Sequence, residues 1–215
     1  MAAGTASAAD LTVRVLTRGG EPAEHVVVAV TPSAAWAPRP EPAPVAIVQR
    51  DIRFLPYVTA VSTGTVVRFV NRDGYDHHVR SLPSGPLGAV APVKQFEFRL
   101  PAHAAGRAEA VVEQRFELPG TVALGCHLHG SMRGHLHVVD SPWVAVTNAE
   151  GRARLADVPD GQANLVLWHP DQLTAQPATQ IEVRDRVTSV DARLNFSPRP
   201  RRPPPSAPLS DYPTQ

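Results

Sequence analysis

The segment Cys126–His137, with the sequence CHLHGSMRGHLH, holds the side chains of this chain that are best suited to bind a metal. It contains the only cysteine of the 215 residues, four of the nine histidines and the only methionine besides Met1. Cys126, His129 and Met132 have the spacing C-x2-H-x2-M, so a short loop can place a thiolate, an imidazole and a thioether around one ion. A single cysteine excludes an internal disulfide, which makes metal binding the first chemistry to consider.

These ligand types favour copper over zinc. Two imidazoles and one thiolate with a weak axial thioether are typical of blue-copper sites, whereas structural zinc sites use four strong ligands. A second histidine is therefore expected from elsewhere in the chain. The pair His77-His78 follows the strand-like run 65–70 and supplies the candidate.

Strands are expected to position these ligands. Residues 121–124 and 134–139 are expected to be strands that flank the ligand loop. Short β-rich runs separated by turn clusters fill residues 45–140 without a sustained helical period, which predicts an all-β sandwich or barrel. Leu11–Leu16, a glycine-rich turn and the β-branched run His25–Thr31 predict a hairpin near the N-terminus.

Clusters among the 23 prolines divide the chain. Proline-rich segments that are poor in apolar residues are typical of linkers and disordered tails. The expected segments are a flexible N-terminus (1–10), flanking β strands (11–31 and 141–195), a proline-rich linker (32–44), a central β domain (45–140) and a disordered tail (196–215).

Two motifs carry a resemblance to cupredoxins. The run FVNRDxxxHHV at residues 69–79 resembles a segment of plastocyanin-like cupredoxins, and CxxHxxMRG at residues 126–134 resembles the ligand loop of amicyanin. The resemblance covers residues 45–140, under half of the chain, and implies a Greek-key cupredoxin sandwich with additional flanking β-sandwich strands. The implied ligands of one type 1 copper ion are His77, Cys126, His129 and Met132.

The whole chain resembles a narrower group of exported, methylamine-utilisation-like bacterial proteins. They set a cupredoxin beside carboxypeptidase-regulatory-like, transthyretin-like strands, and the later Trp168-His169-Pro170 adds to this likeness. It implies that residues 11–31 and 141–195 form one split domain around the cupredoxin; the alternative is one continuous, elaborated cupredoxin. The group also implies a periplasmic or otherwise exported location, although the first ten residues show no signal-peptide core.

The cupredoxin resemblance implies an electron carrier rather than an enzyme. A redox partner would dock transiently near His129, on a patch formed by Leu128 and the apolar loop 82–93. Asn71 and His78 are the candidates for tuning the Cys126 sulfur by hydrogen bonding. One alternative is a protein that stores or delivers copper, which the extra histidines favour. Another is a metal-free scaffold that binds a partner or sugar, for which the four ligand residues would be a coincidence.

Charge and hydropathy limit other functions. A net charge of +1 argues against a general nucleic-acid binder, and no stretch approaches the roughly 18 apolar residues of a membrane span. His135 and His137 are two residues apart on an expected strand and so share a face. We expect that face to be solvated, with a second metal site as the alternative, and we expect His127 to be exposed.

Overall fold

The regular secondary structure of the described residues consists almost entirely of β-strands, as the short β-rich runs of the sequence predict. The computed structural model describes residues 8–36, 40–184 and 186–200. Among these residues the only helical element is a short 3-10 turn, η1 (Pro86–Gly88). No helix in the described part of the chain is long and apolar enough to cross a bilayer. The predicted all-β fold class is therefore confirmed.

The central part of the chain forms a β-sandwich of two sheets. One sheet has the strand order β4-β3-β6-β9 and the other the order β5-β11-β10-β7-β8. Their shared core contains Phe54, Phe69 and Phe116, and it also includes Cys126 and Met132. The strands are β3 (Val45–Arg50), β4 (Arg53–Leu55), β5 (Val58–Ser62), β6 (Val66–Asn71), β7 (His77–Leu82), β8 (Glu97–Leu100), β9 (Ala110–Arg115), β10 (Gly120–Cys126) and β11 (Arg133–Val139).

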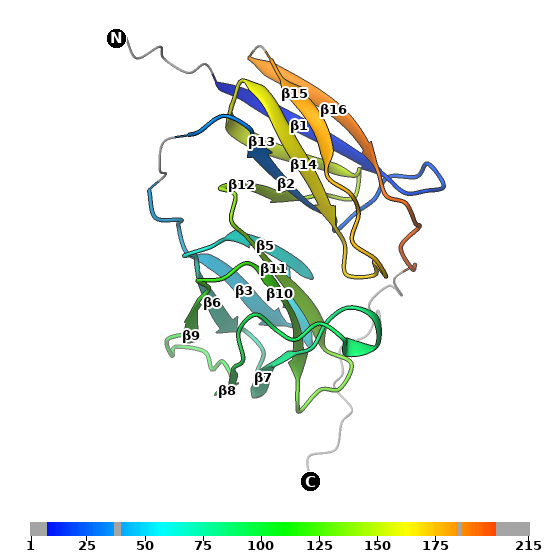
Figure 1. The fold of residues 1–215 in the computed structure, drawn as a ribbon. Coiled ribbons are helices and arrows are strands. Elements are labelled where there is room, and N and C mark those ends of the chain that lie inside the picture. Colours follow the sequence, from blue (N-terminus) through cyan, green and yellow to red (C-terminus); the bar gives the residue numbers. More distant parts are fainter. Residues whose placement is uncertain (1–7, 37–39, 185, 201–215) are drawn as a thin grey trace.

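The two flanking parts of the chain combine into a second β-sandwich (Figure 1). One sheet has the order β13-β1-β16 and the other β12-β2-β14-β15, around a separate core that includes Leu11, Val28 and Leu165. We call this the upper sandwich and the central one the lower sandwich, as they lie in Figure 1. The strands are β1 (Ala8–Leu16), β2 (Val27–Pro32), β12 (Trp143–Val146), β13 (Arg152–Pro159), β14 (Gly161–Trp168), β15 (Thr179–Val183) and β16 (Val187–Arg193).

The predicted N-terminal hairpin is wrong. β1 pairs with β13 and β16, whereas β2 pairs with β12 and β14, so the two strands lie in opposite sheets. The connecting loop wraps around the end of β12, where Thr147 donates its amide to the Val26 carbonyl and accepts from the amide of His25 through its own carbonyl. The strand patterns were recognisable, but they do not encode which strand is the partner.

The expected ends of the chain also need correction. Ala8 to Asp10 belong to β1, so strand structure begins inside the segment expected to be flexible, and residues 1–7 lie outside the described residues. At the other end, Phe196 packs against the upper core and its carbonyl accepts from the Arg18 amide. The segment 196–200 is therefore held against the protein, while 201–215, the rest of the expected tail, lie outside the described residues.

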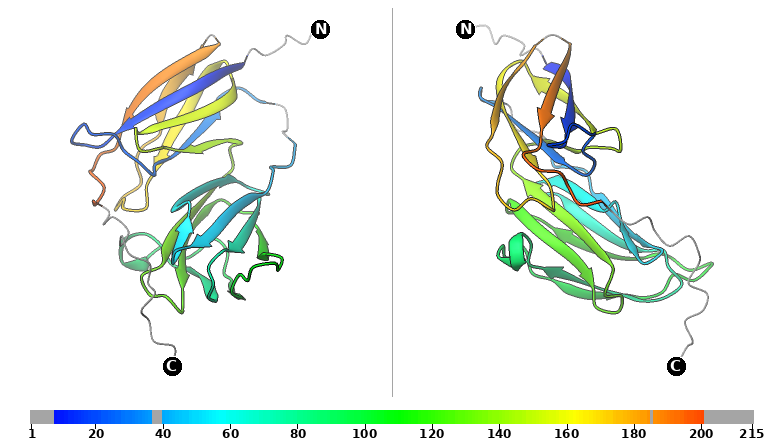
Figure 2. Two further views of the ribbon diagram at one scale, coloured as in Figure 1. Left: turned by 180° about the vertical axis from the view of Figure 1, so that it is seen from behind. Right: turned by 90° about the vertical axis from the view of Figure 1, so that its right-hand side faces the viewer.

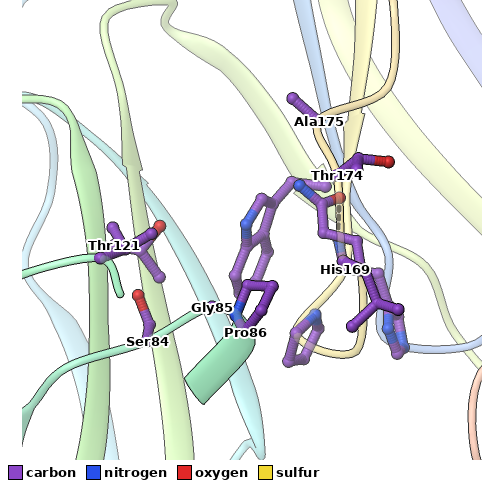
Figure 3. Close-up of a pocket in the computed structure, with 12 residues that line it drawn as sticks. Ser84, Gly85, Pro86, Thr121, His169, Thr174 and Ala175 are labelled. Carbon is purple, nitrogen blue, oxygen red and sulfur yellow. Dashed lines mark hydrogen bonds between the residues drawn. The ribbon is translucent and has the colours of Figure 1, made fainter. Parts of the chain in front are cut away.

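The two sandwiches lie end to end and remain distinct in both views of Figure 2. Aromatic contacts join them, including a stacked pair of His137 from β11 and Trp168 from β14, with ring centroids 4.5 Å apart. A pocket of about 190 Å³ opens beside this contact. Figure 3 shows Ser84 and Thr121 on one wall and Thr174 on the other.

Candidate metal centre

Three of the four predicted ligands meet at one end of the lower sandwich. His77 is the first residue of β7, Cys126 is the last residue of β10, and His129 lies in the loop between β10 and β11. One potential ligand atom of each of these residues lies within 4.8 Å of the other two. β7 and β10 are antiparallel neighbours with Val79 opposite Cys126, which brings residues 49 positions apart in sequence to the same sheet end.

The distances within this group fit a metal ion. The Cys126 Sγ lies 3.7 Å from His77 Nδ1 and 3.5 Å from His129 Nδ1. Bonds of about 2.3 Å to sulfur and about 2.0 Å to nitrogen, at an angle of roughly 110–120°, separate the two donor atoms by about 3.5–3.7 Å. The donor set also fits chemically, because two imidazoles with one thiolate are the strong ligands of blue-copper sites.

Asp73 orients the His77 ring. His77 is fully buried, and its Nε2 lies 2.8 Å from the Asp73 Oδ2. A carboxylate only accepts hydrogen bonds, so Nε2 is the donor. In the neutral ring this leaves the lone pair on Nδ1, which faces Cys126. The Asp73–His77 pair therefore selects the tautomer that can bind a metal.

Backbone donors hold Asp73 itself in place. The amide of Asp51 donates to Oδ1 at 2.7 Å and the amide of Ile52 to Oδ2 at 3.2 Å. Asp51 and Ile52 have φ angles of 53° and 56°, so the turn between β3 and β4 directs both amides at this carboxylate. The Asp73 amide in turn donates to Asn71 Oδ1 at 2.9 Å.

Asn71 and His78 act differently from the roles predicted for their side chains. The Asn71 side-chain amide donates to the carbonyls of Tyr75, Leu100 and Pro101, so it ties the loop before β7 to the end of β8. The backbone amide of His78, rather than its ring, approaches the Cys126 Sγ at 3.4 Å. The hydrogen bond to the Cys126 sulfur therefore does not depend on the side chain at position 78.

Met132 closes the ligand loop. Its amide donates to the His129 carbonyl at 2.9 Å, and its carbonyl accepts from the Cys126 amide at 3.4 Å. The side chain is 1% exposed and belongs to the same core cluster as Cys126. Its role as a weak axial ligand stays a prediction.

The surface above the group is partly apolar. His129 is half-buried, and burial together with the neighbouring His77 lowers its pKa, which favours the neutral imidazole that a metal requires. Tyr75, which sequence reasoning did not single out, packs against the rings of both His77 and His129 with centroids 5.5 and 5.4 Å away. Tyr75 and Leu128 are 40% and 53% exposed and provide apolar surface next to the ligands.

Loop residues Ser84 to Pro86 line the pocket that faces the upper sandwich.

The expectation of a solvated face for His135 and His137 is wrong. Both are half-buried at the junction of the sandwiches. His137 stacks on Trp168, and its Nδ1 lies 3.1 Å from the Thr121 Oγ1. His135 packs edge-on against Tyr57. The expectation that His127 is exposed is confirmed.

Comparisons with known proteins give structural neighbours only. No protein-family model matches the sequence, and no curated protein matches it. A Cu(I) methionine-to-alanine mutant of amicyanin is 20% identical, with a TM-score of 0.34, over 44% of this chain and 80% of that chain. An oxidised proline-to-glycine mutant of amicyanin is 21% identical, with a TM-score of 0.34, over 51% and 97%. The copper-containing nitrite reductase of Thermus scotoductus SA-01 is 26% identical, with a TM-score of 0.37, over 50% and 25%. TM-scores this low do not establish a shared function.

Proposed function

We propose that this chain is a type 1 copper protein that carries single electrons between redox partners. The observation that carries the proposal is the Cys126 thiol flanked by the Nδ1 atoms of His77 and His129 at 3.7 and 3.5 Å. Copper, when bound, supplies one-electron redox chemistry. Met132 is the proposed fourth, weak ligand.

The protein's own contribution would be to hold the ligands still. His77 is fixed by Asp73, Cys126 ends a central strand of its sheet, and His129 is fixed by the turn that Met132 closes. Ligands held by strands and short turns change position little between two charge states of a metal. A small rearrangement favours fast electron transfer, which is the property a carrier needs.

The partner would bind next to His129. Tyr75 and Leu128 provide apolar area around a ligand that is itself partly exposed. Redox encounters bury small interfaces, typically below about 1,200 Å², which suits short-lived contact. We propose this surface, an exported location and a role as carrier rather than enzyme as parts of one hypothesis.

The second part of the proposal concerns the strands of the upper sandwich, which would form a separate domain. We propose that residues 8–32 and 143–193 form one domain and that the lower sandwich is inserted into it. What supports this is the pairing of β1 with β16 in parallel and of β2 with β12 and β14. A kinship with transthyretin-like domains stays a prediction.

A Cu(II) titration of the metal-free protein tests the copper site. For the wild type we expect an intense blue absorption band and narrow copper hyperfine splitting in the EPR spectrum, because a thiolate bond delocalises the unpaired electron onto sulfur. Cys126→Ser should lose both features. Reversible bleaching by one electron per copper would support the carrier role.

The runner-up function, copper storage or delivery, gives a different result. A pale Cu(II) spectrum that is the same in the wild type and in Cys126→Ser would reject the thiolate site. Binding through histidines alone would then favour copper handling. A chain that binds no copper would favour the scaffold.

A further inference from the structure

The two strands that supply His77 and Cys126 carry a second pair of potential ligands on their other face. Side chains alternate between the faces of a strand, so each buried ligand is followed by a residue that points outward. His78 follows His77 on β7, and His127 is the first residue after Cys126, which ends β10. The inner pair is buried, whereas His78 is half-buried and His127 is exposed.

The outward-facing histidines lie directly beside each other. Their ring centroids are 5.6 Å apart, and the His127 amide donates to the His78 carbonyl at 2.9 Å. A carboxylate from the neighbouring strand joins them, because the His78 Nε2 lies 3.0 Å from the Glu97 Oε1 of β8. Strands β7 and β8 and the residue that follows β10 thus bring two imidazoles and one carboxylate to the same face of the sheet.

We propose that His78, His127 and Glu97 form a second metal site, which takes an exchangeable divalent ion such as Cu(II). Imidazole nitrogen and carboxylate oxygen are suitable ligands for Cu(II) and Zn(II), and Cu(II) binds most strongly among the divalent ions of its row. The potential ligand atoms of the three residues do not all lie within 4.8 Å of one another, so the His127 ring must turn toward His78 before an ion can bind. His127 is exposed, which leaves its ring room to turn. Two imidazoles and one carboxylate leave further positions of the ion open to water.

Neighbouring charges make this site weaker than the buried one. Arg80 is two residues beyond His78 and lies on the same face, opposite Glu97 across the strand pair. Arg99 also faces this side, but the Asp76 carboxylate pairs with its guanidinium. The positive charge of Arg80 opposes a divalent cation. Since the ligands are also open to solvent, we expect the ion to exchange readily.

The outer site does not depend on the proposed function. Its ligands come from the opposite side of the strands, so an ordinary Cu(II) ion can bind there whether or not the thiolate site is of type 1. The two sites also differ in spectrum. A copper ion held by nitrogen and oxygen gives a pale colour and wide hyperfine splitting, which separates it from the blue band of a thiolate site.

The test is a Cu(II) titration of the full chain, with bound copper counted by equilibrium dialysis and followed by EPR. The wild type should bind two equivalents, of which one has the ordinary spectrum. His127→Ala and His78→Asn should each bind one equivalent fewer, and Glu97→Gln should bind the ordinary equivalent several-fold more weakly. His25→Asn, which removes a histidine from the upper sandwich and keeps a residue type that tolerates its φ of 64°, should bind as the wild type does.

Two results would overturn the outer site. One is a wild type that binds no copper with the ordinary spectrum. The other is an ordinary equivalent that persists with unchanged affinity in both His127→Ala and His78→Asn. The wild type could also lack the blue band while His127→Ala removes a copper equivalent with the ordinary spectrum. This result would reject the type 1 proposal and leave the outer site intact. Cys126→Ser should conversely keep the ordinary equivalent.

Discussion

The carboxylate of Asp73 determines which nitrogen of His77 faces the thiol of Cys126. It accepts from His77 Nε2 on one side and from two turn amides on the other, so its position is fixed by the backbone of a different strand pair. A carboxylate partner also makes the opposite nitrogen a better donor. Metal affinity at this site should therefore depend on a residue that never touches the metal.

We predict that Asp73→Asn weakens copper binding by about 10–100-fold, the usual effect of removing such a partner. The variant keeps the size of the side chain but loses the negative charge. Affinity is measured by competition with a chelator at pH 7. Asp76→Asn is the matched control, because its carboxylate pairs with Arg99 and the Ala102 amide and does not contact the His77 ring. Equal losses in the two variants would contradict a specific role for Asp73.

The ligand loop was predictable because its information is local. Cys126, His129 and Met132 are separated by two residues each, and a strand on either side brings two of them to one point without help from the rest of the chain. His77 was assigned only through a resemblance, since 49 residues separate it from Cys126. Asp73 stands in the quoted motif without an assigned role, and Tyr75 gave no signal, because their roles come from ring contacts and turn amides that only the folded chain creates.

The end of β12 holds the loop that carries the chain from β1 to β2. Thr147, directly after β12, is buried, and its hydroxyl donates to the Ala23 carbonyl at 2.7 Å while accepting from the Val26 amide at 2.9 Å. Both partners belong to the loop between β1 and β2. This hydroxyl is part of the reason that the two strands separate into opposite sheets instead of forming a hairpin.

We expect Thr147→Val to lower the free energy of unfolding by about 2–3 kcal/mol, because the isosteric side chain leaves one buried amide and one buried carbonyl without their partner. Urea unfolding of the metal-free protein measures the change. Thr179→Val on the exposed face of β15 is the control and should change stability by less than about 0.5 kcal/mol. A loss at Thr147 no larger than that of the control would show that the loop holds without this hydroxyl.

Strand positions could be predicted because they follow from local sequence patterns. Strand partners could not, because pairing depends on segments that are distant in sequence. Alternation of apolar and polar residues marks β1 and β11, and β-branched runs mark β2, each within a few residues. Pairing in this fold joins segments as distant as β1 and β16, which depends on contacts that no local pattern contains. The same limit explains why His135 and His137 were expected in water, since the opposing Trp168 and Tyr57 come from other strands.

The stack of His137 on Trp168 connects the stability of the junction to pH. Burial lowers the pKa of His137 to about 4, from its ordinary value of 6.5. The unfolded chain therefore takes up a proton near pH 6.5, whereas the folded chain takes it up only near pH 4. Between these values the unfolded state binds more protons, so the folded state loses stability as the pH falls.

We expect His137→Phe to remove this part of the acid sensitivity, since phenylalanine can keep the ring contact with Trp168 without titrating. Between pH 7 and pH 4 the free energy of unfolding of the wild type should fall by at most about 3 kcal/mol more than that of the variant. Above pH 7 the two curves of unfolding free energy against pH should run parallel. Unfolding in urea at a series of pH values checks the difference. Parallel curves over the whole range would show that His137 titrates normally in the folded protein.

The pairing of β2 with β12 has a consequence for how this molecule could have arisen. The two strands are antiparallel neighbours with Val30 opposite Trp143, so a tight turn of a few residues would suffice to join them. The whole lower sandwich occupies the place of that turn. The entropic cost of closing a loop grows only slowly with the length of the loop. A segment of this size can therefore be gained or lost there by recombination without breaking any strand pair of the upper sandwich. A variant in which a short turn replaces residues 33–140 should therefore still fold into the upper sandwich.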